Sequence, residues 1–157
     1  GKIIDGITLP HNFSAKATPT SAKVIIDGSL VSMEAYNIYN NSYFKLRDIA
    51  KVLAISPKRF DVTWDDVNKA VNIVPGKSYT EVGGELASGD GKAKLAKLSN
   101  TSITIMGDKI SLMAFSINGN NYFNIMDLAK TLNFYISWNA DQNEIIINTN
   151  QIYVNKQ

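Results

Sequence analysis

The sequence contains no cysteine and only one histidine, His11, among its 157 residues. The lack of cysteine excludes disulfides, thiolate metal ligands and cysteine nucleophiles. A single histidine cannot build a multi-histidine copper or zinc site, and it excludes most serine–histidine catalysis. Because His11 follows Pro10 in a segment without hydrophobic periodicity, we expect it in a solvated loop. The sequence therefore predicts no catalytic, metal or cofactor site.

Long hydrophobic runs and a strong excess of one charge are also missing. No apolar run exceeds five residues, far below the roughly 20 that cross a bilayer as a helix. Lysine and arginine total 16 against 14 acidic residues, a net charge of +2, and only two of the basic residues are arginines. So small a charge does not indicate a polyanionic partner. We expect neither a membrane span nor a nucleic-acid partner.

The sequence does contain a globular composition and an internal duplication. Hydrophobic residues make up 45% and charged residues 19%, which is typical of a folded domain. Residues 23–53 share 12 identities with residues 102–132 at a constant spacing of 102 − 23 = 79. Further on, Trp64 aligns with Trp138 at a spacing of 138 − 64 = 74. Such self-similarity indicates two homologous units.

Each unit predicts three strands, one helix and two more strands. In the first unit, a β-branched run before Asp27-Gly28 indicates a hairpin, and apolar residues from Leu46 to Leu53 follow the spacing of an amphipathic helix. The expected strands and helix of this unit cover residues 24–26, 31–38, 43–46, 46–53 (the helix), 60–64 and 70–74. We therefore predict an α+β fold with two tandem β-β-β-α-β-β units, each a curved, mostly antiparallel sheet packed on one helix.

The chain divides on the same grounds into five segments. A Pro-, Ser- and Thr-containing start indicates an extended leader, and a stretch rich in Gly and Lys indicates a linker between the units. The predicted segments are a leader (1–21), the first unit (22–78), the linker (79–101), the second unit (102–150) and a tail (151–157).

Five strings of the sequence carry a family resemblance: Lys23 to Gly28, Ala35 to Ile38, Tyr43 to Ala50, Phe60 to Asp65 and Tyr79 to Leu86. In this order and spacing, and with the duplication, they closely resemble the copper amine oxidase N-terminal-like domain of secreted Gram-positive bacterial proteins. That resemblance implies a stalk-like, repeated and non-catalytic module that is secreted or lies on the cell surface. It does not imply copper chemistry, because copper amine oxidases use three histidine ligands and this chain has one.

Aromatic residues and one arginine form the candidate ligand-binding set. Trp64 and Trp138 occupy equivalent strand ends, each followed by Asp or Asn. Exposed aromatic rings beside polar groups could stack on sugar rings, whereas buried rings would pack between sheet and helix as core residues. Both interpretations stay open from the sequence. The full candidate set is Trp64, Trp138, Tyr36, Tyr43, Tyr122 and Arg47.

The second unit departs from the first where Lys45 and Arg47 become Asn124 and Met126, and where Tyr36 becomes Phe115. A ligand that used the Lys/Arg pair would therefore bind the first unit alone. Asp48 and its equivalent Asp127 fall in the first turn of each expected helix, a position that favours carboxylates.

Acidic residues around the first helix, namely Asp48, Asp61, Asp65 and Asp66, could form a charged cluster with the nearby arginine. Without a histidine partner, a phosphate-binding loop or a nucleophile elbow, the cluster does not indicate catalysis. We predict a non-catalytic structural or interaction module, with a cell-wall polymer or another protein domain as partner. The alternative is an adaptor that binds cell-wall glycan or peptidoglycan through exposed aromatics.

Overall fold

The computed structural model describes residues 2–4, 7–10, 13–20 and 22–155. His11 lies outside the described residues, so its predicted loop position stays a prediction. Over the described part of the chain, neither helix has the length and hydropathy that a membrane crossing requires.

The two sequence copies form matching series of elements, preceded by a short hairpin of β1 (Lys2–Ile4) and β2 (Ile7–Leu9). The first series is β3 (Ser14–Pro19), β4 (Lys23–Ile26), β5 (Ser29–Val31), β6 (Ala35–Ile38), β7 (Asn41–Lys45), α1 (Leu46–Val52), β8 (Phe60–Asp65) and β9 (Ala70–Pro75). The second series is β10 (Lys94–Leu98), β11 (Ser102–Ile105), β12 (Asp108–Ile110), β13 (Ala114–Ile117), β14 (Asn120–Asn124), α2 (Ile125–Leu132), β15 (Tyr135–Asn139) and β16 (Glu144–Asn148). We call these series the first and second repeats.

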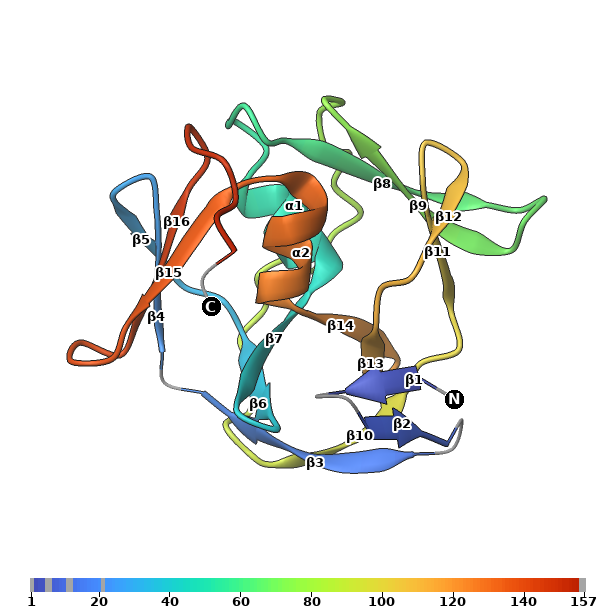
Figure 1. Cartoon of the computed structure of the whole chain (residues 1–157), viewed down its shortest axis with the longest axis horizontal. Coiled ribbons are helices and arrows are strands. Elements are labelled where there is room, and N and C mark those ends of the chain that lie inside the picture. The colour runs from blue at the N-terminus through green and yellow to red at the C-terminus, as the bar shows by residue number, and fades with distance from the viewer. Residues whose placement is uncertain (1, 5–6, 11–12, 21, 156–157) are drawn as a thin grey trace.

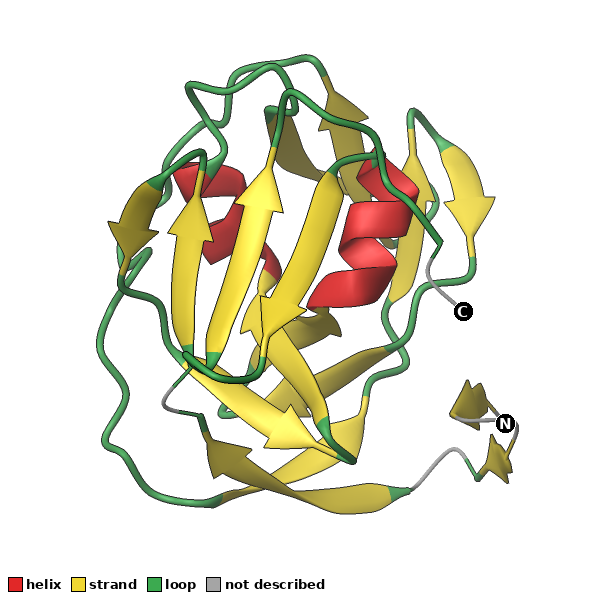
Figure 2. Cartoon of the chain, turned by 60° about the vertical axis from the view of Figure 1, so that its left-hand side comes forward, coloured by secondary structure: helices red, strands yellow, loops and turns green. Residues whose placement is uncertain are grey.

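Six of the described strands close into a barrel in the order β10-β13-β14-β7-β6-β3, so each repeat supplies three neighbouring strands. Eight others form two four-stranded sheets, β15-β16-β4-β5 and β12-β11-β9-β8. Figure 1 shows the two helices between these sheets, with the barrel below them. Figure 2 shows the same layers from the side.

The predicted α+β fold of two tandem units is wrong, because the repeats exchange strands and the structure is mostly β. Hairpin β4-β5 of the first repeat pairs with the second repeat, where β4 runs parallel to β16. In the same way β11 of the second repeat runs parallel to β9 of the first. Each sheet therefore joins a hairpin from one repeat to a hairpin from the other. Local patterns had indicated the hairpins but not their partners.

The pairing register reveals a pseudo-twofold axis between the repeats. In the barrel, Phe44 of β7 lies opposite Phe123 of β14, and these residues are equivalents because 123 − 44 = 79. On the other side of the barrel, Lys16 of β3 lies opposite Leu95 of β10 at the same spacing of 95 − 16 = 79. The repeat thus begins at β3 and β10, strands that lie in the segments predicted as leader and linker.

Both helices begin where the sequence predicts, at Leu46 and Ile125. Asn133 ends α2 in the left-handed conformation with φ of 59°, which asparagine tolerates. Each helix contacts strands of both repeats, since α1 packs on β7, β8 and β14, and α2 on β14, β7 and β15. Phe44 and Phe123 are fully buried beneath the helices in one shared hydrophobic core.

The barrel interior is a second core that contains three of the candidate tyrosines. Tyr36 and Tyr122 meet edge to face at 5.4 Å, and the equivalent pair Phe115 and Tyr43 has the same distance and angle. Such edge-to-face pairs add stability beyond burial alone. Small alanines at positions 17 and 96 complete this core where β3 and β10 approach each other.

Candidate functional site

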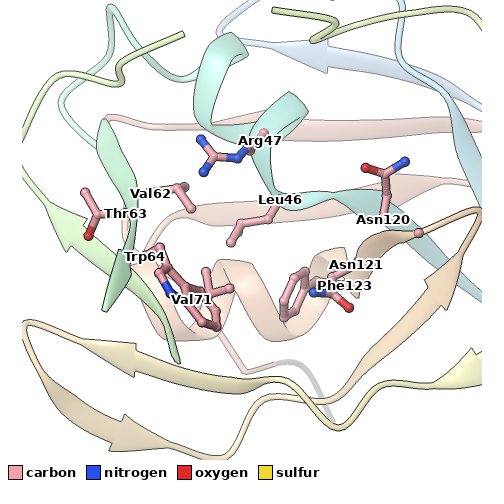
Figure 3. Close-up of a pocket in the computed structure, with 10 residues that line it drawn as sticks. Leu46, Arg47, Val62, Thr63, Trp64, Val71, Asn120, Asn121 and Phe123 are labelled. Carbon is pink, nitrogen blue, oxygen red and sulfur yellow. The ribbon is translucent and has the colours of Figure 1, made fainter. Parts of the chain in front are cut away.

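A pocket at the border of the two repeats is the first candidate site (Figure 3). Its cavity measures about 200 Å³. The first repeat supplies the start of α1 and the strands β8 and β9, and the second supplies Gly119 of the β13–β14 turn and residues of β14. The lining residues are Leu46, Arg47, Val62, Thr63, Trp64, Val71, Gly119, Asn120, Asn121 and Phe123. We call this the Trp64 pocket.

A second, smaller pocket of about 80 Å³ lies at the equivalent place in the other half of the molecule. It is lined by Asn40, Asn41, Ser42, Ile125, Met126, Ile136, Ser137, Trp138 and Ile145. These residues correspond to those of the Trp64 pocket at the spacings of 79 and 74, with Phe123 alone lacking a counterpart in the lining. We call it the Trp138 pocket. The pseudo-twofold axis therefore produces two related sites.

Both candidate tryptophans are exposed. Trp64 is 56% exposed and Trp138 is 63% exposed. Alternation along β8 places Trp64 on the same side as Phe60 and Val62, but the core ends at Val62, so the indole projects past it to the pocket edge. The core-packing interpretation of the two indoles therefore does not fit, and the exposed-aromatic interpretation does.

Arg47 is held at the Trp64 pocket by Tyr79, a residue of the segment that connects the repeats. Its Nη1 donates a hydrogen bond to the Tyr79 hydroxyl oxygen at 3.2 Å, and its guanidinium carbon lies 5.9 Å from the centre of the Tyr79 ring. The Tyr79 hydroxyl in turn donates to Glu85 at 2.5 Å. This bond is the main reason that the pKa of Glu85 is lowered to about 2. Tyr79 and Glu85 lie in one of the strings that carry the family resemblance, but the sequence did not mark either of them as a site residue.

The other three candidates, Tyr36, Tyr43 and Tyr122, lie inside the barrel and are each 2% exposed. The structure does not bring them to either pocket. The hydroxyls of Tyr36 and Tyr122 donate to the Glu34 carboxylate, which also pairs with Lys45 at 3.3 Å. Burial is the main cause that raises the pKa of both tyrosines. These rings have a packing role in the barrel.

The pocket also contains polar residues that the sequence did not single out as a site. Asn120 and Asn121 come from the start of β14 in the second repeat, and Thr63 comes from β8 of the first, where its hydroxyl accepts from the Asn72 amide at 3.5 Å. Asn121 contacts Thr101 through its amide at 3.4 Å. The turn sequence Asn-Gly-Asn-Asn was readable as a turn, but its position against the other repeat follows only from the strand exchange.

The acidic residues near α1 are dispersed rather than gathered into one cluster. Asp65 accepts hydrogen bonds within its own turn, and Asp66 pairs with Lys69 at the surface. Asp61 accepts the Thr80 N–H at 2.9 Å. These contacts fix turns and loops, and none of them places two carboxylates together in a pocket.

Asp48, predicted at the start of α1, lies there but makes no bond that caps its own helix. Its Oδ1 accepts the Leu86 N–H at 2.9 Å, which ties the connecting segment to α1. Its Oδ2 is buried without a hydrogen-bond partner. Burial is the main cause that raises the Asp48 pKa.

Comparisons of the chain with protein-family models, with curated proteins and with solved structures give no match. The resemblance to the copper amine oxidase N-terminal-like domain therefore stays a prediction based on the sequence strings. Function has to be argued from the two pockets.

Proposed function

We propose that this chain is a non-catalytic interaction module of a secreted or cell-surface protein, and that its two pockets bind saccharide units of a cell-wall glycan. The observation that carries the proposal is the pair of exposed indoles at equivalent pocket edges, Trp64 and Trp138. The secreted or surface location rests on the sequence resemblance.

The chemistry of the pockets suits a sugar ring. A saccharide has apolar C–H faces and a rim of hydroxyls, so it needs an aromatic wall together with neutral hydrogen-bonding groups. The Trp64 pocket offers an indole beside the amides of Asn120 and Asn121. The Trp138 pocket offers an indole beside Asn41 and Ser42.

A stalk or spacer function alone gives no reason for large apolar rings at the surface. Transferring an indole out of water is favourable, so a purely structural module gains stability by burying it. Here the indoles are exposed in both repeats, each next to a cavity that the other repeat completes. The presence of an exposed indole at both pockets favours a ligand that packs on each ring.

The test is co-sedimentation of the purified chain with isolated Gram-positive cell walls at low and moderate salt. We expect binding that persists at moderate salt, because stacking and neutral hydrogen bonds are screened little by ions. Trp64→Ala and Trp138→Ala should each weaken binding by at least about tenfold, equivalent to about 1.4 kcal/mol. Iodide should quench the native tryptophan fluorescence.

Val67→Ala supplies the matched control, because Val67 is exposed in the β8–β9 turn and lines neither pocket. This variant should bind cell walls like the unmodified chain. All variants are first checked for native circular dichroism. The glycan proposal fails if folded tryptophan variants bind as well as the control, or if the unmodified chain does not bind.

A further inference from the structure

The two pockets differ by one residue that changes their charge. Arg47 of the Trp64 pocket is replaced by Met126 in the Trp138 pocket. The other equivalent positions keep their character or stay uncharged: Leu46/Ile125, Val62/Ile136, Thr63/Ser137, Trp64/Trp138, Val71/Ile145, Gly119/Asn40, Asn120/Asn41 and Asn121/Ser42. The repeats thus present one cationic pocket and one neutral pocket of the same construction.

The Arg47 guanidinium has no carboxylate partner within 4.0 Å in the described part of the chain. Its side-chain hydrogen bond goes to a neutral phenol, Tyr79. A guanidinium carries five N–H donors, so one bond leaves most of its donor capacity unused. The carboxylate in this chain of contacts, Glu85, accepts its hydrogen bond from the Tyr79 hydroxyl and forms no ion pair with Arg47 within 4.0 Å.

Tyr79 also fixes where the cation lies. Its ring is buried to 9% exposure, and it contacts the guanidinium both through its hydroxyl and through its face. Because these contacts restrict the long arginine side chain before any ligand arrives, less conformational entropy is lost on binding. Figure 3 shows the guanidinium on the side of Val62, with Asn120 toward the other end of the pocket.

Arginine is suited to planar oxyanions, since its donors match the two oxygens of a carboxylate in a bidentate pair. The remaining lining of the Trp64 pocket is neutral and suits a sugar ring. We therefore propose that the Trp64 pocket selects a saccharide that carries a carboxylate, with Arg47 on the carboxylate and Trp64 on the ring. The Trp138 pocket accepts an uncharged saccharide. This inference rests on the proposed function and assigns different ligands to its two sites.

The probes for the test are two β-1,4-linked glucose disaccharides, one neutral and one with a terminal glucuronate in place of glucose. The chain contains only two tryptophans, so their indole N–H signals in a proton–nitrogen spectrum report each pocket separately. Trp64→Phe and Trp138→Phe assign the two signals. We expect the uronate to shift the Trp64 signal with at least tenfold higher affinity than the neutral sugar, and the Trp138 signal to show no such preference.

The matched variant is Arg47→Met, which gives the Trp64 pocket the residue of its twin. It should reduce the ratio of uronate to neutral affinity at Trp64 from tenfold or more to about one. Inorganic phosphate serves as competitor: displacement of the uronate only at large excess supports carboxylate selection. Equally effective displacement overturns it in favour of a general anion site.

Two failures are distinguishable. If both sugars bind with equal affinity at Trp64, or if folded Arg47→Met keeps the preference, the carboxylate inference is overturned while glycan binding stands. If neither sugar shifts either indole and cell walls do not bind the chain, the proposed function fails and the inference falls with it. Native circular dichroism of Arg47→Met verifies that a lost preference is not a lost fold.

Discussion

At the scale of single residues, the structure contains a buried carboxylate whose hydrogen-bonding capacity is only partly satisfied. Asp48 is 1% exposed, and one of its oxygens holds the connecting segment through the Leu86 N–H while the other has no partner. Burial raises its pKa, although the Leu86 N–H and the charge of Lys45 act in the opposite direction. A raised pKa means that the folded state binds this proton more tightly than the unfolded state.

The raised pKa makes the contribution of Asp48 to the free energy of unfolding depend on pH. This contribution is most favourable below the ordinary pKa of 3.8, where the group is protonated in both the folded and the unfolded state. It declines as pH rises from that value through the raised pKa of the folded state. We therefore predict that Asp48→Asn increases the free energy of unfolding at pH 7, because it replaces a carboxylate that is costly to bury with a neutral side chain of the same size. The gain should vanish at pH 3.

Urea unfolding at pH 3, 5 and 7 measures this prediction. Asp66→Asn is the control, because Asp66 is exposed and its ion pair with Lys69 lies at the surface, where such pairs contribute little. A loss of stability at pH 7 in Asp48→Asn would show that the bond to Leu86 outweighs the cost of the buried charge.

At the scale of elements, the two parallel strand junctions determine how the repeats combine. Where β4 meets β16, Asp27 of the β4–β5 turn accepts hydrogen bonds from the Thr149 N–H at 2.8 Å and from its hydroxyl at 2.6 Å. Where β9 meets β11, Asn72 accepts from the Thr104 hydroxyl at 2.7 Å. Each junction therefore has a polar bridge between repeats, built from different residues.

We predict that Thr149→Val lowers the free energy of unfolding by about 2 kcal/mol, because it removes a partly buried hydrogen bond to a carboxylate while it keeps the side-chain volume. Thr104→Val removes a bond to a neutral amide and should cost about 1 kcal/mol. Both threonines are 1% exposed, which makes the pair a matched comparison. Urea denaturation measures both, and a Thr149→Val variant as stable as the unmodified chain would contradict the bridging role.

The junctions also explain why the sequence indicated the elements but not the fold. Apolar spacing placed the starts of both helices correctly, and Asp27-Gly28 marked the β4–β5 turn, because these signals act within one segment. The choice between pairing within a unit and pairing across units depends on strand edges that are similar in both copies. For example, Val71 of β9 pairs with Ile103 of the other repeat. Nothing in the sequence around Val71 indicates that its strand pairs with the other repeat at this edge.

Two barrel strands were missed for a related reason. β3 contains Lys16 and Pro19, and β10 contains Lys94 and Lys97, so both segments looked like a leader or a linker. Their buried residues in the barrel core are Ala17, Ala96 and Leu98, none of which is β-branched. The candidate site was predicted only in part for a similar reason. The sequence marked the tryptophans, but it could not show that residues of the opposite repeat complete each pocket.

At the scale of the whole molecule, neither repeat possesses a complete sheet system. Each contributes three strands to the barrel and one hairpin to each four-stranded sheet, and both helices share one core. Separating the repeats would expose that core and leave the parallel edges of β4, β9, β11 and β16 unpaired. The full chain should therefore unfold in one cooperative transition.

We predict that residues 1–92 and residues 93–157, produced separately, show no cooperative urea transition as monomers, because neither half can bury the shared core around Phe44 and Phe123. Mixing them should restore the near-ultraviolet circular dichroism of the intact chain. Sedimentation shows whether each half is a monomer or a dimer. A half that folds only as a dimer obtains the missing strands from its second copy, so it still needs strands from two repeats. Cooperative unfolding of a monomeric half would instead show that strand exchange is dispensable, and that the two pockets can form without each other's repeat.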